Sequence, residues 1–263
     1  MKRFKLTVAY DGTNYCGWQI QPGAPTVEGE LNKALKQLTG KDIQVIGASR
    51  TDAGVHAYGN VAVFDSDTPI PGEKLLFALN PRLPEDIRIV DSCQVDDDFH
   101  PRHCDTRKTY EYHIHTGRTP LPTCRLYSHW IPRMLDVEAM NTAGQYLVGT
   151  HDFKSFCAAQ TQVKTTVRTV LGITVEENFS DSTIALINKN MPGNVYPQDI
   201  VIRVEGEGFL YNMVRIISGT LLKVGLHAWQ PQYVQEILES RDRTKAGETV
   251  PAKGLFLKKI EYL

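Results

Sequence analysis

The first pattern in the chain is an alternation, because every second residue at positions 3–10 is large and apolar. The apolar positions are Phe4, Leu6, Val8 and Tyr10. This period of two predicts a strand with one buried face. Apolar residues at helical spacing follow, with Thr26 as the expected N-cap and Gly40 as the expected C-terminal cap.

The rest of the chain continues to mix the two patterns. Further strands are predicted at 43–48, 60–64, 86–95, 108–116, 166–176, 183–188, 199–205 and 255–262, and helices at 72–79, 136–147, 208–224 and 231–240. We therefore expect an α+β fold in which two α/β halves share a mostly antiparallel central sheet flanked by helices. The expected halves are residues 1–104 and 105–263, with a ligand site at their junction.

One loop between two predicted strands stands out for its chemistry. Residues 47–56 read Gly-Ala-Ser-Arg-Thr-Asp-Ala-Gly-Val-His. In an extended stretch, Arg50 and Asp52 lie on the same face, and the guanidinium would lower the carboxylate pKa by roughly 1–3 units. Asp52 is thus a candidate nucleophile, although an isolated Arg-Thr-Asp is more often an exposed turn.

The composition indicates which broad class of protein the chain belongs to. The 263 residues carry a net charge of −1, with 41% hydrophobic and 22% charged residues, as in an ordinary globular protein. No run of about 18 apolar residues predicts a membrane span, and the start of the chain lacks a signal-peptide pattern, so we expect a cytoplasmic protein. The odd number of cysteines, five, argues against a disulfide framework.

The basic residues are unevenly distributed. Residues 100–133 contain six Lys or Arg side chains against two acids, interleaved with the aromatic residues Tyr110, Tyr112, Tyr127 and Trp130. This stretch fits either an RNA-binding surface or a solvated face of mixed charge. His56, His151 and Asp152 are of residue types that bind metal ions. Nothing supplies a third ligand at a spacing diagnostic of a metal site, so no metal site is expected.

The longer run around Asp52 resembles the signature of the tRNA pseudouridine synthase A family. Other stretches are similar to motifs of the same family. They are 9–19, 26–29, 78–80, 83–87, 149–156, 209–215 and 251–255. The resemblance thus extends over nearly the whole chain. One departure is Thr109, which stands where the family usually has a basic residue.

The resemblance implies roles for individual residues. The implied catalytic residues are Asp52, Arg50 and Arg215, and the implied substrate-binding residues are Tyr110, which stacks on the target base, Leu255, Thr51 and His56. The N-terminal half would carry the Asp52 loop, and the C-terminal half would carry Tyr110 and the helix of Arg215. That helix is apolar on most sides, so its arginine requires a partner, for which Asp52 is the candidate.

The resemblance also implies an activity: isomerisation of uridine to pseudouridine at positions 38, 39 and 40 in the anticodon stem-loop of tRNA, by a homodimer. The reaction involves no redox change and loses no group, so no cofactor is expected. Two alternatives remain open from the residues alone. One is a nucleoside or glycoside hydrolase that uses Asp52, and the other is a non-catalytic RNA-binding module.

Overall fold

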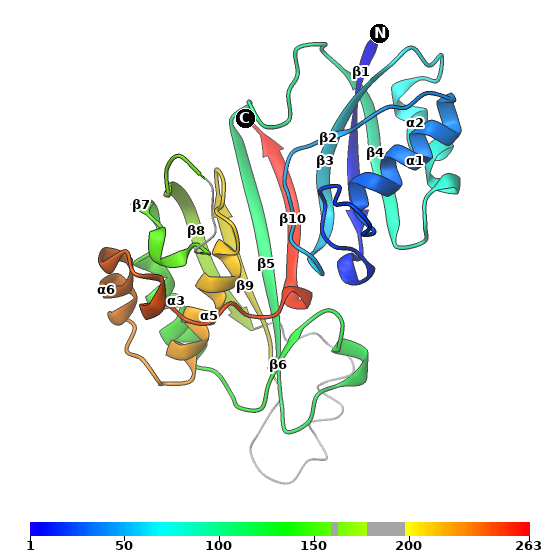
Figure 1. Cartoon of the computed structure of the whole chain (residues 1–263). Coiled ribbons are helices and arrows are strands. Elements are labelled where there is room, and N and C mark those ends of the chain that lie inside the picture. Colours follow the sequence, from blue (N-terminus) through cyan, green and yellow to red (C-terminus); the bar gives the residue numbers. More distant parts are fainter. Residues whose placement is uncertain (159–162, 178–197) are drawn as a thin grey trace. The chain divides into compact units, whose positions relative to one another are not determined.

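The computed structural model describes residues 1–158, 163–177 and 198–263, which form two compact units (Figure 1). Unit 1 comprises Met1–Thr106 and Phe256–Leu263, and unit 2 comprises Arg107–Leu255. The chain therefore builds most of unit 1, then unit 2, and returns to unit 1 with its final strand. The strand predicted at 183–188 lies outside the described residues.

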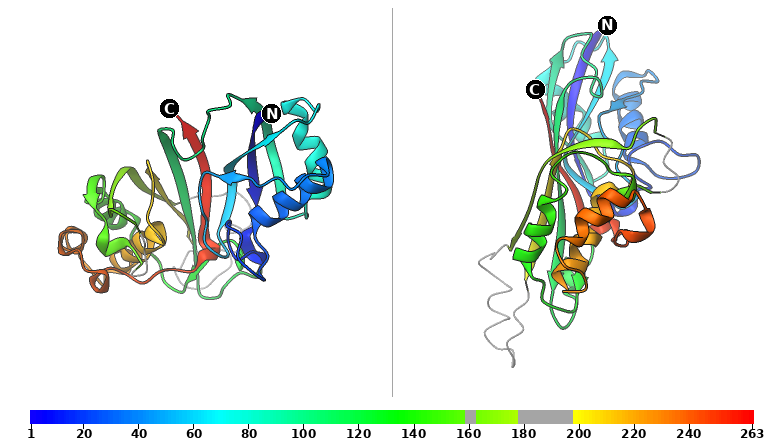
Figure 2. Two further views of the ribbon diagram at one scale, coloured as in Figure 1. Left: turned by 45° about the horizontal axis from the view of Figure 1, so that its top comes forward. Right: turned by 90° about the vertical axis from the view of Figure 1, so that its left-hand side faces the viewer.

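Unit 1 is a mostly antiparallel sheet with helices on one face (Figure 2). Its elements are β1 (Lys2–Tyr10), α1 (Val27–Thr39), β2 (Ile46–Gly47), β3 (His56–Ser66), α2 (Leu75–Leu79), β4 (Ile87–Val95) and β10 (Leu255–Tyr262), with 3-10 turns at Gly12–Asn14, Gly72–Lys74 and Asn80–Arg82. The strand order is β4-β1-β3-β10, and β2 pairs with β3. β1 is antiparallel to β3 and β4, whereas β3 and β10 are parallel.

The sequence pattern accounts for the first elements of this unit. In β1, Phe4, Leu6 and Val8 are buried, and the residues between them are partly exposed. Thr26 Oγ1 accepts a hydrogen bond from the Gly29 N–H at the start of α1, and Gly40 ends the helix with a left-handed φ of 72°. The predicted strand and both predicted caps are confirmed.

Unit 2 contains the remaining strands of the sheet and its own helices. Its elements are β5 (Thr106–Thr116), β6 (His129–Ile131), α3 (Val137–Gln145), β7 (Gly149–Asp152), β8 (Val167–Glu177), β9 (Asp199–Gly206), α5 (Met213–Gly225) and α6 (Tyr233–Ser240), with 3-10 turns at Pro122–Cys124, Lys154–Phe156, Arg243–Lys245 and Ala252–Gly254. The order β5-β9-β8-β7 is antiparallel throughout, and β6 runs parallel to β5.

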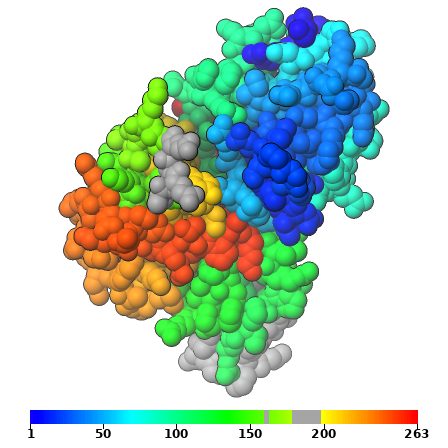
Figure 3. Space-filling model, viewed as in Figure 1, coloured from blue at the N-terminus to red at the C-terminus, as the bar shows by residue number. Residues whose placement is uncertain are grey.

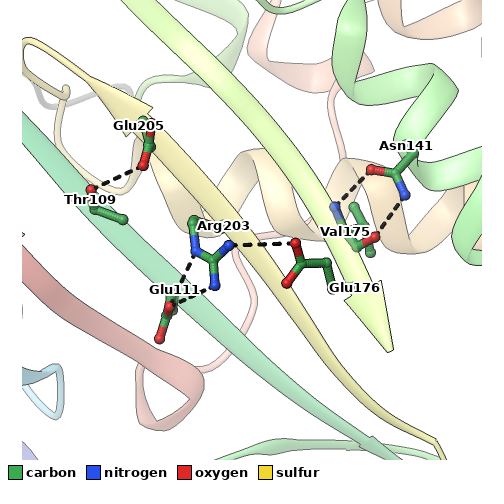
Figure 4. Close-up of polar contacts among 7 residues, drawn as sticks. All are labelled: Thr109, Glu111, Asn141, Val175, Glu176, Arg203 and Glu205. Atoms are coloured by element: carbon green, nitrogen blue, oxygen red, sulfur yellow. Dashed lines mark hydrogen bonds and ion pairs between the residues drawn. The ribbon is translucent and has the colours of Figure 1, made fainter. Parts of the chain in front are cut away.

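Two kinds of polar contact hold the strands of unit 2 (Figure 4). On one face, Arg203 of β9 lies between Glu111 of β5 and Glu176 of β8, with N–O distances of 3.3 and 3.5 Å. On the helix side, Asn141 of α3 donates to the Val175 carbonyl and accepts from its N–H, both at 2.7 Å. The polar cross-strand contacts fix the register, while α3 is tied directly to β8.

The predicted fold class, an α+β chain with a large, mostly antiparallel sheet flanked by helices, is confirmed. The helix predicted from residue 208 is wrong at its start, because Asn212 adopts a left-handed φ of 61° and α5 begins only at Met213. Of the strand predicted at 43–48, only Ile46–Gly47 pairs with a neighbour. The sequence pattern also missed the short strands β6 and β7.

Candidate active site

The candidate carboxylate, Asp52, lies on the loop that joins β2 to β3 in unit 1. The loop covers residues 48–55, and Asp52 is half-buried while Arg50 is exposed. The Val55 N–H donates to the Asp52 carbonyl at 3.1 Å, which closes a tight turn around the acid. The carboxylate is thus presented at a turn instead of lying within a strand.

The backbone of this loop is held by the turn that follows β1. The Trp18 N–H donates to the Thr51 carbonyl at 3.1 Å, and the Gly54 N–H donates to the Tyr15 carbonyl at 3.2 Å. These two bonds hold the chain just before and just after Asp52. The Asp52 main chain therefore has little freedom to move relative to the rest of unit 1.

Two glycines allow the turn to approach the loop so closely. A Cβ on Gly12 would lie 2.0 Å from the Val55 carbonyl oxygen, and a Cβ on Gly17 would lie 2.6 Å from the Thr51 carbonyl oxygen. Gly17 also has a φ of +92°, which other residues rarely adopt. The Gly12 and Gly17 positions of the first motif are therefore explained by contact with the Asp52 loop.

Thr51 and its neighbours form a buried polar cluster under the loop. The Thr51 hydroxyl lies 2.7 Å from the Tyr10 hydroxyl at the end of β1. Asn60 of β3 donates to the Ser49 carbonyl at 3.0 Å from a fully buried position. The Thr51 side chain thus points into this cluster, and its predicted contact with substrate stays a prediction.

His56, the first residue of β3, is also buried. Its Nδ1 accepts a hydrogen bond from the Gly12 N–H at 3.0 Å and lies 3.1 Å from an Asp11 carboxylate oxygen. The ring stacks on Phe256 of β10, with centroids 4.6 Å apart. In this geometry the contacts of His56 hold the end of the loop in place. Its predicted role in substrate binding stays a prediction.

Tyr110, the predicted stacking residue, lies on β5 in unit 2. Its ring meets Phe209 edge to face, with centroids 5.2 Å apart. Gly206 at the end of β9 makes room for this arrangement, since a Cβ there would lie 2.9 Å from the Phe209 ring. Phe209 therefore sets the orientation of the Tyr110 ring, a role that sequence reasoning missed.

Arg215 lies on the first turns of α5. Its Nε donates to the Val250 carbonyl at 2.8 Å, and one terminal nitrogen donates to the Asn212 side-chain oxygen at 2.9 Å. Val250 belongs to the segment after α6, which runs over the surface of unit 2 in orange to red (Figure 3). Two fixed hydrogen bonds thus orient the guanidinium, and its predicted pairing with Asp52 stays a prediction.

Leu255 is buried and directly follows a close contact in unit 2. The Tyr112 hydroxyl donates to the Pro251 carbonyl at 2.9 Å, and a Cβ on Gly254 would lie 2.9 Å from the Tyr112 ring. Burial raises the pKa of Tyr112, so its hydroxyl remains protonated and can donate this bond. The motif at 251–255 is therefore shaped by its packing on Tyr112.

The structure brings the predicted residues together in two groups. Arg50, Thr51 and Asp52 lie on one loop of unit 1, and His56 begins the strand that follows it. Tyr110 on β5, Arg215 on α5 and Leu255, the last residue of unit 2, form the second group. Residues that hold these groups were missed by sequence reasoning. They are Tyr10, Trp18, Asn60, Gly206 and Phe209. The signal for Tyr10, Trp18 and Phe209 was present, since each falls within a recognised motif.

Among the residues that the structure describes, no group of three or more His, Cys, Asp or Glu side chains is placed to hold a metal ion. Within the same residues, every helix is too short or too polar to cross a membrane.

Comparison with known proteins places the chain in a family. It matches the family described as tRNA pseudouridine synthase over residues 6–103 and 143–263. A tRNA pseudouridine synthase A from a Thermoanaerobacter species is 46% identical over 263 residues, with 100% of both chains covered. Those of Clostridium kluyveri and Brevibacillus brevis are 45% and 44% identical over 262 residues, again with 100% of each chain covered. The chain therefore belongs to the tRNA pseudouridine synthase family, whose members are isomerases.

Proposed function

We propose that this enzyme isomerises uridine to pseudouridine at positions 38, 39 and 40 in the anticodon stem-loop of tRNA, with Asp52 as the nucleophile. Family membership supports the reaction, and the resemblance of the Asp52 run to the family signature supports the positions. The observation that carries the role of Asp52 is its half-buried place on a loop whose backbone is bonded on both sides.

The reaction explains why one positioned carboxylate is sufficient. The N1–C1′ bond of the nucleotide breaks, the uracil turns, and a C5–C1′ bond forms. C5 loses its proton and N1 gains one, so the atoms and electrons balance without a cofactor. Asp52 either attacks C1′, as carboxylates do in retaining glycosidases, or assists loss of the 2′ proton. Both routes require an ionised carboxylate held beside the sugar.

The target uridine must leave its helical stack to reach this carboxylate. Extrusion of a base costs a few kcal/mol, and stacking on an aromatic ring returns about 1–3 kcal/mol. In our proposal Tyr110 supplies that ring. Its edge-to-face contact with Phe209 fixes the ring in advance, so less conformational entropy is lost when the base binds.

The arginines complete the proposed site. Arg215 is oriented by the Val250 carbonyl and the Asn212 side chain, and in our proposal it pairs with Asp52 when the site is assembled. Such a pair favours the ionised form of the acid. Arg50 is exposed and two residues from Asp52, and in our proposal it contacts the substrate.

The proposal includes an assembly and a location. Two copies of the chain would grip one L-shaped tRNA, with recognition based on shape and phosphate contacts more than on base sequence. The cytoplasm is the proposed location because the substrate is tRNA. Sedimentation of the free protein and of its tRNA complex measures the assembly directly, and a single copy on tRNA would contradict the dimer.

The activity is tested with an unmodified tRNA transcript that has uridine at positions 38, 39 and 40. The matched substrate carries cytidine at those three positions and is otherwise identical. We expect pseudouridine only in the first transcript, mapped to the three positions and accompanied by release of tritium from 5-tritiated uridine. Modification at other positions would overturn the assignment of the anticodon arm, and release of free uracil would identify a hydrolase instead.

A further inference from the structure

A second arginine of unit 1 is bonded to the start of the Asp52 loop. Arg102 Nε donates to the Gly47 carbonyl at 2.6 Å. Gly47 ends β2, and Arg50 follows it by three residues. The bond therefore places the Arg102 guanidinium beside the chain that carries Arg50 and Asp52, although about fifty residues separate them in sequence. Arg50 and Arg102 together are called the arginine pair below.

The turn that carries Arg102 is itself anchored. The Arg102 N–H donates to His100 Nδ1 at 3.2 Å. The Tyr262 hydroxyl of β10 donates to the Pro101 carbonyl at 3.3 Å, and its ring meets Phe99 edge to face at 5.0 Å. These contacts hold the turn, so Arg102 has a defined position and is not a freely moving surface side chain.

The glycine under Arg102 is also required. A Cβ on Gly47 would lie 2.3 Å from Trp18 Nε1, so only glycine lets the indole lie against the chain here. Trp18 is the same residue whose N–H holds the Thr51 carbonyl. One tryptophan therefore contacts both the residue that anchors Arg102 and the residue that precedes Asp52.

The arginine pair carries positive charge that the described residues leave unneutralised. Within the described ranges, Arg50 forms no hydrogen bond or ion pair, and the only such bond of the Arg102 guanidinium is to Gly47. The pKa of Arg102 is lowered by burial and by the charge of Arg50, and Glu28 opposes this less strongly. The Glu28 carboxylate already accepts the Ile20 N–H at 2.9 Å. Two neighbouring guanidinium groups, neither of which is bonded to an acid among the described residues, favour binding of an anion.

We propose that Arg50 and Arg102 together bind one phosphate of the RNA backbone beside the uridine that enters the Asp52 site. The inference rests on the proposed function for its ligand, since a tRNA substrate offers phosphodiesters at this loop. Arginine is suited to this role because its planar fork binds phosphate oxygens in a bidentate manner. Such a contact fixes the register of the strand and carries no base sequence information.

The choice of a phosphate over a base follows from the exposed, charged character of the pair. Arg102 has its Nε occupied by Gly47, which leaves its two terminal nitrogens for two oxygens of one group. A phosphate held here would keep the flipped nucleotide at a fixed distance from Asp52. The arginine pair would thus position the sugar while Tyr110 holds the base.

The test is tRNA affinity as a function of salt, measured with the full-length chain. The variants are Arg50→Gln, Arg102→Gln and the double variant, and Arg82→Gln is the matched control. Arg82 is another exposed arginine of unit 1, and its guanidinium also donates to a main-chain carbonyl, that of Ala78 at 2.6 Å. We expect about tenfold weaker binding for each single variant, the scale of one lost charge-assisted contact, and no change for Arg82→Gln.

The salt dependence distinguishes one shared phosphate from two separate ones. If the pair binds one phosphate, the slope of log K against log salt falls by roughly 0.7 to 0.9 in the double variant. A fall of roughly twice that amount would mean two independent contacts and would overturn the proposal. Unchanged affinity and slope in Arg102→Gln, at an unchanged melting temperature, would overturn it as well.

Two further measurements keep the outcome decisive. If Arg102→Gln melts at a lower temperature, Arg102→Lys replaces it, and the proposal then expects several-fold weaker binding because lysine offers a point charge without the fork. Unchanged binding by Arg102→Lys would contradict the proposal. Binding is measured separately from turnover, so an inactive wild-type chain that binds tRNA through the pair would refute the proposed reaction and leave the phosphate contact supported.

Discussion

The two groups of candidate residues are held in place in different ways. In unit 1 the Asp52 loop is fixed through its main chain, by bonds from Trp18 and to Tyr15 and by two glycines that admit close approach. In unit 2 the candidate side chains themselves make the orienting contacts, Tyr110 with the Phe209 ring and Arg215 with the Asn212 side chain and the Val250 carbonyl. The position of the Asp52 carboxylate therefore depends on the backbone of one turn. The orientations of Tyr110 and Arg215 depend instead on packing between segments that lie far apart in the sequence.

The largest expected effect comes from filling the space at Gly12. In Gly12→Ala the new methyl group would lie 2.0 Å from the Val55 carbonyl oxygen, so the backbone of the loop must move. We expect the free energy of unfolding to fall by about 3 kcal/mol, the upper range for overpacking. Chemical denaturation measures this loss.

The matched control for Gly12→Ala is Gly172→Ala, because a Cβ at Gly172 meets no atom of the described residues within 4 Å. A similar loss of stability in both variants would show that glycine itself, and not the contact with the loop, determines the effect.

The corresponding position in unit 2 is Gly254, where a methyl group would lie 2.9 Å from both the Tyr112 ring and the His113 carbonyl oxygen. The ring is one of the two near neighbours, and it can shift by a few tenths of an ångström. We therefore expect Gly254→Ala to lower the free energy of unfolding by about 1–2 kcal/mol, less than Gly12→Ala. A larger loss than that of Gly12→Ala would reverse the comparison between the two units.

The strained residue before α5 provides a third test. Asn212 combines a left-handed φ of 61° with a hydrogen bond from Arg215. Asn212→Gly keeps the backbone conformation and loses only the bond, whereas Asn212→Ala loses both. We expect Asn212→Ala to be about 1 kcal/mol less stable than Asn212→Gly, with kcat reduced in both variants. Equal stability of the two variants by thermal denaturation would mean that the conformation is not strained.

The contact between Phe209 and Tyr110 is expected to affect catalysis more than stability. Phe209→Leu keeps an apolar side chain but loses the edge-to-face geometry, which contributes about 0.5–1.5 kcal/mol. We expect kcat/KM on a tRNA transcript to fall by about threefold to tenfold through misorientation of Tyr110. Unchanged kcat/KM, together with a normal melting temperature, would show that Phe209 does not orient the ring.

The smallest expected effect is at the buried hydroxyl pair of unit 1. Tyr10→Phe and Thr51→Val each remove one partner of the 2.7 Å hydrogen bond. A double-mutant cycle should give a coupling energy of about 1 kcal/mol, because the two hydroxyls lie in the buried cluster beneath the loop. A coupling near zero would remove this bond from the set that holds the Asp52 loop.

How much of the fold and site could be predicted from the sequence depends on whether neighbouring residues carry the signal. The Asp52 loop could be identified because its residues are contiguous and lie between two apolar strands. The start of α5 could not be located, since Phe209 and Leu210 continue the apolar pattern while Asn212 adopts a left-handed φ before the helix begins. Arg102 was counted only as part of a basic stretch, because its bond to Gly47 joins segments that lie far apart in the sequence.

The measurement that tests the central claim most directly is single-turnover pseudouridine formation by Asp52→Asn, with tRNA affinity measured on the same preparation. The control, Asp42→Asn, makes the same chemical change at an exposed acid of unit 1. We expect Asp52→Asn to lose at least about a thousandfold in rate and to keep its tRNA affinity and melting temperature, while the control is unaffected. A rate near that of the wild type in Asp52→Asn would contradict the assignment of Asp52 as the nucleophile.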